Sequence, residues 1–563
     1  MTNKPVLLTG RAALEHAGAE RFQAQWKALY DRCAWSTVCQ HPDFVLPWYA
    51  LYGSRFVPVL VLEYAADGAL AALLPLALHA NGRGLSGAGD LQAEYQCWLQ
   101  APDTDGRFIL RAVRCLQERF AHADLCLKYL PADISLGGID ASCEFGGNCV
   151  WRRYRRPLMR IEPGAMDRQR SKKNHRQNFN RLSRLGEVRF QHVTEPEQFA
   201  HIVGELCHQY DFRQAALFRE RVFAQDAAKR QFNLELHRRG LLHAAILTVG
   251  KDIAASHFGL MTPGRAVHLG IMTHDPAWAA HSPGILLLAM LGVHLVEEKL
   301  PLFDLTPGGD SYKEHFASEH DSVLELVIYA NAARRWQTQL LTSLVDFSRQ
   351  RLRKAGIDML DVKAWLMHLR ERRWPPSASR WWDKMRPASR APVLRYAGAA
   401  PAAAGSLPVS KNRLLDIVGF DAEGSAASYS AFMCTVKKRM ERCQHLYTFM
   451  QDGVLAMACW VSTQAAGGEA PGDRQAGSPA ARTVVLSDLY LHRRCEGSAL
   501  VGRFIETILH EVVDQQKSEV VYRGAVSTQL KATLVRCGFV DAGVEASGGR
   551  ASRSVPGVSI NRP

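Results

Sequence analysis

The chain has 563 residues, of which 47% are hydrophobic and 22% are charged, and its formal net charge at pH 7 is +14. These values are typical of a globular protein of three or four domains, and they exclude a disordered, fibrous or collagen-like chain. The positive charge favours anionic partners such as phosphorylated cofactors, nucleic acid, acidic polysaccharide or a membrane surface, without choosing among them.

Cysteine spacing and hydropathy bear on metal sites and location. The 13 cysteines include no C-x-x-C pair, so we expect no metal and reduced thiols. The first ten residues lack a basic segment followed by an apolar run, as a secretory signal would have. The longest apolar helix candidate, 284–296, is too short to span a bilayer and contains His294. The sequence therefore predicts a cytoplasmic protein without a transmembrane segment.

Three segments repeat one arrangement of strands. Residues 57–78 contain two β-rich runs around an Asp67-Gly68 turn, which predicts a hairpin. Residues 241–272 contain three such runs with turns at 250–252 and 263–264, which predicts an antiparallel meander. A third copy begins at Leu446 and ends with a strand at 483–491. Each copy is preceded by a helical stretch.

The hydrophobic period changes from two to about 3.6 after the second and third meanders. This change predicts helices at 285–299 and 499–516, each followed by a short strand. The order of helix, meander, helix and strand is that of an α+β unit. Linkers are expected at 370–390 and 397–406, and a polar surface loop at 467–479.

The second unit contains two motifs that together suggest a cofactor site. S-P-G-I-L-L-L at 282–288 places a small turn before an apolar helix, and exposed N–H groups at a helix N-terminus bind phosphate. We expect coenzyme A pyrophosphate there, although Gly284 could be a tight-turn residue only. The second motif is F-D-L-T-P-G-G-D-S-Y-K at 303–313. Its Tyr312 could protonate a thiolate or could simply be packed in the core. Its Lys313 could neutralise phosphate or could simply be solvated. The predicted cofactor-binding residues here are Ser282, Pro283, Gly284, Ile285 and Lys313.

Several motifs resemble a known family. They are W-S-T-V-C-Q-H-P-D-F at 35–44, G-A-G-D-L-Q-A-E-Y at 87–95, S-K-K-N-H-R-Q-N-F-N-R-L at 171–182, and the 282–287 and 303–316 segments. Residues 20–330 resemble the CelD-type acetyltransferases of polysaccharide biosynthesis, a GNAT-superfamily branch related to the FemAB peptidyltransferases. The resemblance implies acetyl-CoA or another acyl-CoA as donor, and two GNAT-like units around one cleft.

The third unit resembles GNAT proteins independently. Arg494, Gly497 and Ala499 fit the superfamily's Arg/Gln-x-x-Gly-x-Gly/Ala loop, which implies a second cofactor-binding segment. Leu534 stands where many relatives have a tyrosine, and Ser527 where an asparagine is common. These departures imply that the third unit either binds cofactor poorly or is a structural relic.

Acyl transfer from a thioester needs a base for the acceptor, a donor for the oxyanion and an acid for the leaving thiolate. His257, His268 and His274 lie on or just after the second meander, where a neutral imidazole could be the base, although each could also be a packed or surface histidine. Asp275 could orient an amine or cap the next segment. The predicted catalytic residues are His257, His274, Asp275 and Tyr312.

Arginines and lysines are dense between residues 152 and 189. This run could bind polyphosphate, tRNA or an acidic glycan, but such runs are commonly solvated faces, and no interleaved aromatic platform is present. We therefore do not expect nucleic acid as the main partner, although the FemAB relationship keeps tRNA open.

Together these observations predict an α+β fold of tandem GNAT-like units, with mostly antiparallel sheets flanked by helices. The expected domains are 1–160, an acyl-CoA-binding unit at 161–335, a helical and Pro/Ala-rich linker at 336–405, and a divergent GNAT domain at 406–550. The expected function is acyl-CoA-dependent N- or O-acyl transfer to a sugar or cell-envelope precursor, with acetyl as the expected acyl group. The alternatives are a non-catalytic scaffold of a polysaccharide-synthesis machine and a FemAB-like aminoacyl-tRNA-dependent transferase.

Overall fold

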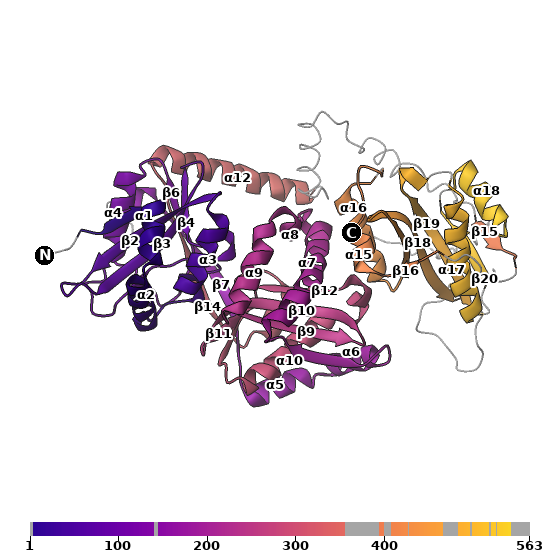
Figure 1. The fold of residues 1–563 in the computed structure, drawn as a ribbon, viewed down its shortest axis with the longest axis horizontal. Helices are drawn as coiled ribbons and strands as arrows, with labels where there is room; N and C mark the ends of the chain where they lie inside the picture. The colour runs from indigo at the N-terminus through magenta and orange to yellow at the C-terminus, as the bar shows by residue number, and fades with distance from the viewer. Residues whose placement is uncertain are drawn as a thin grey trace, which may run out of the picture. The chain divides into compact units, whose positions relative to one another are not determined.

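The computed structural model describes residues 4–139, 145–354, 393–398, 407–425, 427–465, 482–495, 498–516, 519–524 and 526–541. The chain divides into two compact units, Met1–Arg373 and Trp374–Pro563, which we call the N-terminal and C-terminal units. Each unit contains a mixed sheet that is mostly antiparallel and is flanked by helices (Figure 1). The predicted α+β class is therefore confirmed, whereas the domain boundaries at 160, 335 and 405 stay predictions.

The N-terminal unit is built on one continuous sheet. In its described residues the sheet has 14 strands in the order β1-β2-β3-β4-β6-β14-β7-β13-β11-β10-β9-β8, with β5 paired to β3 and β12 paired to β10. The strands are β1 (Val6–Thr9), β2 (Phe56–Tyr64), β3 (Leu70–His79), β4 (Gly84–Gly87), β5 (Leu99–Gln100), β6 (Asp124–Leu130), β7 (Cys149–Arg160), β8 (Val188–His192), β9 (Leu242–Val249), β10 (Asp252–Thr262), β11 (Ala266–His268), β12 (Ile271–His274), β13 (Leu302–Asp304) and β14 (Glu319–Ile328).

Helices cover both faces of this sheet. They are α1 (Arg11–Gly18), α2 (Glu20–Arg32), α3 (Pro42–Tyr52), α4 (Phe108–Arg119), α5 (Pro163–Arg170), α6 (Lys173–Ser183), α7 (Pro196–Phe218), α8 (Val222–Gln225), α9 (Ala227–Arg238), α10 (Pro283–Glu297), α11 (Ser311–Phe316) and α12 (Ala332–Lys354). A 3-10 turn, η4 (Pro276–His281), precedes α10. Around β9 and β10, α7 and α9 lie on one face and α10 on the other (Figure 1).

Strand alternation explains why β9 has a helix layer on each side. Ala244 and Ile246 belong to the apolar cluster that includes Phe199 of α7, whereas Ala245 and Leu247 belong to the cluster that includes Leu287 of α10. Successive side chains of a strand point to opposite faces, so a strand buried on both faces must be apolar at every position. This accounts for the continuous apolar run at the start of the second meander.

The hairpin predicted at 57–78 and the meander that begins near residue 241 are both present. β2 pairs with β3 around Gly68, whose φ is 83°, and β9 pairs with β10 around Gly250, whose φ is 61°. Positive φ is inexpensive only for glycine, so these two residues place the turns. The predicted helix at 285–299 corresponds to α10.

The C-terminal unit contains a smaller sheet. In its described residues seven strands run in the order β16-β17-β18-β19-β20-β15-β21. Its elements are β15 (Val393–Tyr396), β16 (Ser410–Lys411), α15 (Leu414–Val418), α16 (Tyr429–Met440), β17 (His445–Gln451), β18 (Val454–Ala465), β19 (Arg482–Leu491), α17 (Leu500–Gln516), β20 (Glu519–Arg523), α18 (Thr528–Arg536) and β21 (Phe539–Asp541). The predicted linker at 370–390, and most of the segments predicted at 397–406 and 467–479, lie outside the described residues. In the part of the chain that is described, no helix combines the length and hydropathy needed to cross a membrane.

Candidate functional site

The third strand of the second meander is broken into β11 and β12, and both pieces pair with β10. Gly270, between them, has a φ of 49°, and a Cβ built on it would lie 2.7 Å from the Phe258 carbonyl oxygen. A Cβ on Gly259 of β10 would lie 2.0 Å from the carbonyl oxygen of His268. The two backbones therefore approach too closely for any side chain, and the break requires glycine on both strands.

Only the first piece of this broken strand has a second neighbour. β13 pairs in parallel with β11 as far as His268 and Asp304, and Leu269 N–H still donates to the Asp304 carbonyl at 2.8 Å. The chain then turns away: Thr306 adopts a φ of 58°, and its N–H donates to Asp304 Oδ1 at 2.8 Å. We call His268 and Asp304 the divergence point. Beyond it, no described strand pairs with the outer edge of β12, which we call the open edge.

Backbone groups of β12 face this open edge. Asp275 N–H donates to the Ala254 carbonyl at 3.1 Å, and hydrogen-bonded pairs alternate along an antiparallel ladder. Met272 and His274 therefore direct their N–H and C=O groups away from β10. In agreement, the Met272 carbonyl accepts a hydrogen bond of 2.9 Å from the Arg213 guanidinium of α7. Sequence patterns did not single out Arg213, because its helix is far from the meander along the chain.

The predicted phosphate loop forms the start of α10, which connects β12 to β13. Ser282 is the N-cap with a φ of 52°, and it makes no side-chain capping bond. Pro283 is the buried first residue of the helix, and Gly284 and Ile285 are half-buried. Gly284 has no atom within 4 Å of where its Cβ would be, so the space beside it is open. Pro283 has no N–H, and the Ile285 and Leu286 N–H groups donate to the Ser282 carbonyl at 3.1 and 3.3 Å. Gly284 N–H is therefore the one first-turn donor for which the described residues provide no backbone acceptor.

The basic helix α6 packs against η4 and α10. It contains most of the S-K-K-N-H-R-Q-N-F-N-R-L motif, whose structural role was not predictable from the sequence. His175 Nδ1 of this helix donates to the Gln169 carbonyl at 2.7 Å, and the His175 ring stacks on Phe316 of α11 with centroids 5.9 Å apart. The motif thus holds α6 beside α11. A surface pocket on α6 is lined by polar side chains only: Ser171, Lys173, Arg176, Gln177 and Asn180.

Tyr312 and Lys313 lie on α11, which begins directly after the Gly-Gly-Asp turn. Lys313 is buried, and its ammonium donates to the Thr306 carbonyl at 3.2 Å and the Pro307 carbonyl at 3.4 Å. Burial lowers the pKa of Lys313, whereas burial raises the pKa of Tyr312 to about 12. Lys313 therefore holds the 306–308 turn in place, and Tyr312 keeps its proton at neutral pH.

The other predicted catalytic residues lie on β10 and at the end of β12. His257 is fully buried with its ring against Phe303, its Nε2 lies 3.1 Å from the His268 carbonyl, and burial lowers its pKa to about 3. His274 is half-buried at the last position of β12. The Asp275 carboxylate caps η4 by accepting from Ala277 N–H at 2.7 Å, and burial raises its pKa to about 7. His257 thus has the contacts of a packed core residue, and Asp275 those of a helix cap.

The divergence point carries a buried polar cluster that the sequence patterns did not assemble. The Asp304 carboxylate accepts a hydrogen bond from the Tyr95 hydroxyl and lies 3.3 Å from Arg156 Nη1 and 3.4 Å from His268 Nδ1. The Glu94 carboxylate lies 3.5 Å from His268 Nδ1. Glu94 and Tyr95 are the last two residues of the G-A-G-D-L-Q-A-E-Y motif. Tyr95 lies 209 residues before Asp304 along the chain, so only the tertiary fold brings the motif close to Asp304.

Charge is distributed unequally within this cluster. Burial would raise the pKa of Asp304, but the His268 ring and the Arg156 charge outweigh burial and lower it. Burial opposes protonation of His268, yet Asp304 and Glu94 raise its pKa. Burial raises the pKa of Glu94. Glu94 Oε2 and both ring nitrogens of His268 are buried without a hydrogen-bond partner. A substrate could therefore form a hydrogen bond with any of these three atoms.

Much of the basic run after residue 152 is neutralised by the neighbouring strand. β7 pairs with β14 in a register that sets Arg156 opposite Asp321 and Arg152 opposite Glu325. Arg152 lies 3.2 Å from Glu325, and Arg156 Nε donates to Asp321 at 2.7 Å. Opposite charges directly across a ladder stabilise the pairing. These arginines are therefore ion-paired along the sheet, and α6 carries the exposed part of the run.

The predicted cofactor loop of the C-terminal unit is described only in part. Arg494 lies in η5 (Arg493–Cys495) and is exposed, and Ala499 is exposed just before α17. Gly497 lies outside the described residues. Leu534 is completely buried in the core of this unit, and the Ser527 hydroxyl caps α18 by accepting from Leu530 N–H at 3.2 Å. The two departures thus have structural roles.

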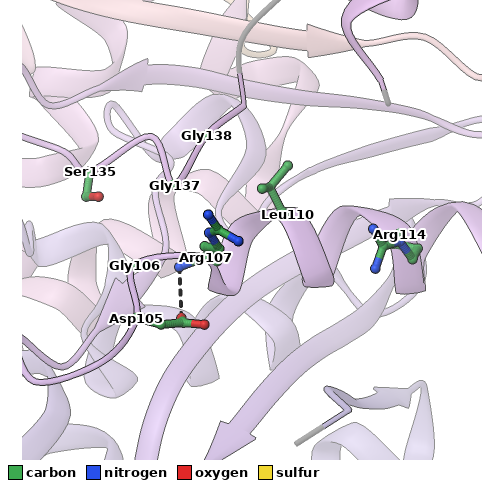
Figure 2. A pocket seen from close by; sticks show the side chains of 8 residues that line it. All are labelled: Asp105, Gly106, Arg107, Leu110, Arg114, Ser135, Gly137 and Gly138. Carbon is green, nitrogen blue, oxygen red and sulfur yellow. Dashed lines mark hydrogen bonds between the residues drawn. The ribbon is translucent and has the colours of Figure 1, made fainter. Parts of the chain in front are cut away.

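Another surface pocket lies beside the start of α4, away from every predicted site residue (Figure 2). The Asp105 carboxylate accepts from Arg107 N–H at 2.9 Å and also pairs with Arg111 at 2.6 Å. The pocket shares no residue with the open edge of β12. Its lining residues are Asp105, Gly106, Arg107, Leu110, Arg114, Ser135, Gly137 and Gly138.

One comparison matches a segment of the N-terminal unit to a known family. Residues 169–314 match the family described as acetyltransferase (GNAT) domain. No curated protein is significantly similar to the chain.

Several solved structures are similar to part of the chain. One is the C-terminal domain of a putative lysylphosphatidylglycerol synthetase from Agrobacterium fabrum, with 12% identity and a TM-score of 0.37 over 57% of this chain and 96% of that one. FemX has 7% identity and a TM-score of 0.39 over 56% and 98% of the two chains. A tandem GNAT protein from the clavulanic acid biosynthesis pathway has 12% identity and a TM-score of 0.36 over 58% and 99%.

Proposed function

We propose that the N-terminal unit is an acyl-CoA-dependent acyltransferase, with acetyl-CoA as donor and the amine or hydroxyl of a sugar or cell-envelope precursor as acceptor. The observation that carries this proposal is the open edge of β12 beside the N-terminus of α10, inside the segment that matches a GNAT acetyltransferase domain. The envelope precursor rests on the resemblance to CelD-type proteins alone.

The donor would lie along the open edge. The Gly284 N–H at the start of α10 would donate to the pyrophosphate, and the cationic side chains of α6 would neutralise its charge. The pantetheine arm would lie along β12, beside the backbone of Met272 and His274, which faces away from β10. This assignment uses Gly284 as the position where the backbone is accessible.

The chemistry requires one bond to form and one to break. The acceptor nitrogen or oxygen attacks the thioester carbonyl carbon, the carbon–sulfur bond breaks, and the acceptor proton passes to a base. The Met272 N–H faces the open edge and could stabilise the oxyanion, and protonated Tyr312 could donate to the leaving thiolate. We assign the base to Glu94 acting with His268, because both lie at the divergence point where the open edge begins, whereas His257 is completely buried with its ring against Phe303.

The same cluster favours an amine over a hydroxyl as acceptor. Two carboxylates, Glu94 and Asp304, approach the unpaired His268 ring. A carboxylate attracts an ammonium group and can then take its proton, which an amine must lose before it attacks. An amino sugar satisfies both this requirement and the envelope-precursor expectation.

Calorimetric titration of acetyl-CoA into the purified chain tests the donor site. Gly284→Trp should fill the open space at the second residue of α10 and abolish binding. Gly164→Trp is the matched control, because Gly164 also follows a proline at the start of a helix, α5, and a Cβ there meets only the flexible Arg168 side chain at 3.3 Å. We expect one binding site per chain in the wild type and in the control.

The contrary outcomes separate the alternatives. Equal affinity in wild type and Gly284→Trp would place the donor elsewhere, including the C-terminal unit. No binding of acetyl-CoA to the wild type would contradict the proposal and leave the scaffold and the aminoacyl-tRNA-dependent transferase. If binding is confirmed, CoA release in the presence of amino sugars, with the N-acetylated sugars as controls, would identify the acceptor.

A further inference from the structure

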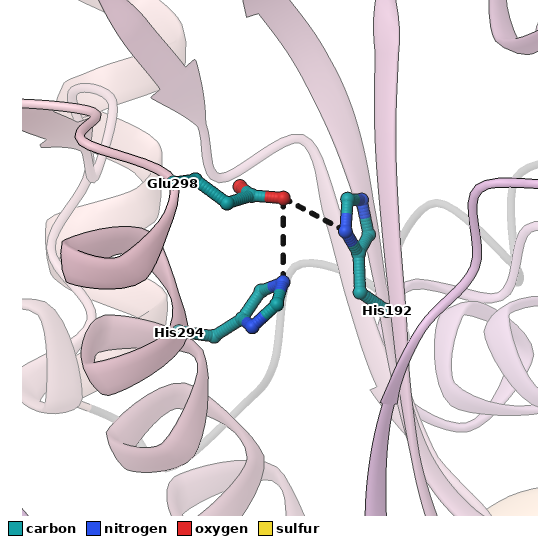
Figure 3. A group of neighbouring side chains, drawn as sticks. All are labelled: His192, His294 and Glu298. Atoms are coloured by element: carbon teal, nitrogen blue, oxygen red, sulfur yellow. Dashed lines mark ion pairs between the residues drawn. The ribbon is translucent and has the colours of Figure 1, made fainter.

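Three histidines and a glutamate converge at the β8 end of the N-terminal sheet. Figure 3 shows two of the histidines, His192 and His294, with Glu298. His192 is the last residue of β8, His243 lies on β9, and His294 and Glu298 lie one turn apart at the C-terminal end of α10. None of them belongs to the open edge of β12 or to the divergence point. Sequence patterns did not identify this cluster, because its members come from β8, β9 and α10, and only His294 and Glu298 share an element.

The distances within the cluster are those of a metal-ligand set. Glu298 Oε1 lies 2.8 Å from His192 Nδ1 and 3.3 Å from His294 Nε2. One ligand atom from each of these three residues lies within 4.8 Å of the others. Ligand atoms at opposite ends of a tetrahedral N–Zn–O angle are about 3.3 Å apart, since Zn–N and Zn–O bonds are about 2.0–2.2 Å. Small rotations of the three side chains would therefore seat an ion.

The polar atoms that point inward are poorly satisfied without an ion. His294 Nε2 and Glu298 Oε2 are buried and make no hydrogen bond. The other ring nitrogen of His294, Nδ1, lies 3.3 Å from Glu297 Oε2, a contact that would hold a proton on Nδ1 and leave the Nε2 lone pair for a metal. A carboxylate behind the ligating imidazole is the usual arrangement in metal sites.

His243 supports the same set from behind. Its ring stacks on His192 with centroids 4.2 Å apart and an interplanar angle of 9°. Its Nε2 lies 3.3 Å from Glu298 Oε2. His192 and His294 contact the other carboxylate oxygen, Oε1. The buried His243 ring fixes the orientation of both a ligating histidine and the ligating glutamate.

We propose that His192 Nδ1, His294 Nε2 and the Glu298 carboxylate bind a divalent transition-metal ion of the Zn²⁺ type. Two imidazoles and one carboxylate suit zinc, and the partly exposed cluster leaves a fourth position for water. The ion would join the edge strand β8 to the C-terminal turn of α10, the helix whose other end forms the proposed donor site. This inference does not depend on the proposed function. The competing account is a metal-free network in which protonated histidines surround the carboxylate.

Zinc titration of the tag-free full chain, stripped with a chelator, tests the inference. Calorimetry should show one tight site per chain. The variants His294→Ala and Glu298→Gln should each lower the affinity at least about 100-fold, as loss of one of few ligands does. His320→Ala is the matched control, because His320 Nε2 lies 2.9 Å from Glu314 in a histidine–glutamate pair that has no third ligand. The control should bind zinc as the wild type does.

Two results would overturn the inference. One is the absence of zinc binding to the wild type, which would favour the metal-free network. The other is undiminished binding to both variants. Circular dichroism checks that the variants fold. If both variants fail to fold, the visible spectrum of the Co²⁺-loaded wild type decides: weak d–d bands support nitrogen and oxygen ligands, and a thiolate charge-transfer band in the near ultraviolet would place the metal at cysteines instead.

Discussion

Both units contain a strand that loses its parallel neighbour, but the residues at the point of separation differ. In the N-terminal unit the last paired residues are His268 and Asp304. In the C-terminal unit β19 pairs with β20 as far as Ser487 and Arg523, and then continues to Leu491 with β18 as its partner. The backbone arrangement is therefore common to both units, whereas a buried carboxylate and imidazole occupy the separation point of one.

This difference shows which property follows from the fold and which from particular residues. An open strand edge beside a helix N-terminus needs only a strand that turns away. Proton transfer also needs ionisable groups held out of water, and Asp304 contributes to both: Oδ1 accepts from Thr306 N–H to turn the chain, and Oδ2 contacts the His268 ring. In the C-terminal unit, the Ser487 hydroxyl accepts from Arg439 at 3.3 Å. We expect acyl transfer in the N-terminal unit.

The largest expected effect comes from removing the proposed base. Glu94→Gln should lower kcat/KM for acetyl transfer to an amino sugar by about 10²- to 10⁴-fold, the usual contribution of a general base. Acetyl-CoA affinity should be unchanged, because Glu94 is not part of the donor site. CoA release and calorimetry measure the two quantities.

The control for this prediction is the carboxylate–histidine pair of the other unit. Asp421 lies 3.3 Å from His492, and Asp421→Asn should leave kcat/KM unchanged. A loss of activity in Asp421→Asn together with a normal rate in Glu94→Gln would reverse the assignment of the two units.

Removing the shared partner of the cluster should affect stability most. Asp304→Ala removes a buried carboxylate from both Arg156 and His268, which keep Asp321 and Glu94 as their remaining partners, and it removes the acceptor of the Thr306 turn. We expect a loss of about 3–5 kcal/mol in the free energy of unfolding, as for broken buried ion pairs. Urea denaturation measures it.

Asp488→Ala in the C-terminal unit provides the comparison. The Asp488 side chain is 59% exposed and pairs with Arg439, so its loss should cost less than about 1 kcal/mol. Similar losses in both variants would mean that the cluster at the divergence point is solvated like a surface pair.

The buried histidine of β10 should make the N-terminal unit sensitive to acid. Burial lowers the pKa of His257 from 6.5 to about 3. Between these values the unfolded chain binds a proton that the folded chain does not, so stability should fall as pH decreases from 6.5 towards 3, by up to about 1.4 kcal/mol per pH unit.

His257→Gln should therefore flatten the decrease in unfolding free energy between pH 6.5 and 4.5, even if its stability at pH 8 is lower. Urea denaturation across this range tests the slope, with the exposed His201→Gln as control. An unchanged slope in His257→Gln would show that His257 is protonated in the folded chain.

The smallest effect is expected at the surface of α6. Arg176→Ala should weaken acetyl-CoA binding only about two- to five-fold, because an exposed ionic contact is worth about 0.2–1 kcal/mol. Arg494→Ala should not change the affinity. The reverse order of effects in calorimetry would indicate that the donor binds the C-terminal unit.

Local patterns in the sequence predicted most of the secondary structure near the site. Alternating apolar residues around Gly68 and Gly250 specify their hairpins, and the change of period after residue 283 specifies α10. The pairing of β7 with β14 was not predictable in the same way, because Arg156 and Asp321 become complementary only in a register between segments 165 residues apart. From the sequence alone, the arginines of β7 are therefore indistinguishable from an exposed basic surface without ion pairs.

The same limit applies to the site residues. The S-P-G motif indicated the start of α10, since its signal lies in adjacent residues. Glu94 and Asp304 were each within a motif that the resemblance included, but their meeting depends on the order of strands between them. Lys313 has the charge to bind phosphate, yet its ammonium contacts carbonyls of the 306–308 turn. Charge can be read from sequence, whereas burial and partners depend on tertiary structure.

Hydrogen exchange of the full chain with and without acetyl-CoA tests the central claim most directly, because it reports where the donor binds. We predict slower exchange of the amides at 283–287, in the first turn of α10, and at 271–274, on β12. Protection at 498–503 of the C-terminal unit instead, or no protection at either place, would contradict the assignment of the donor to the open edge of β12.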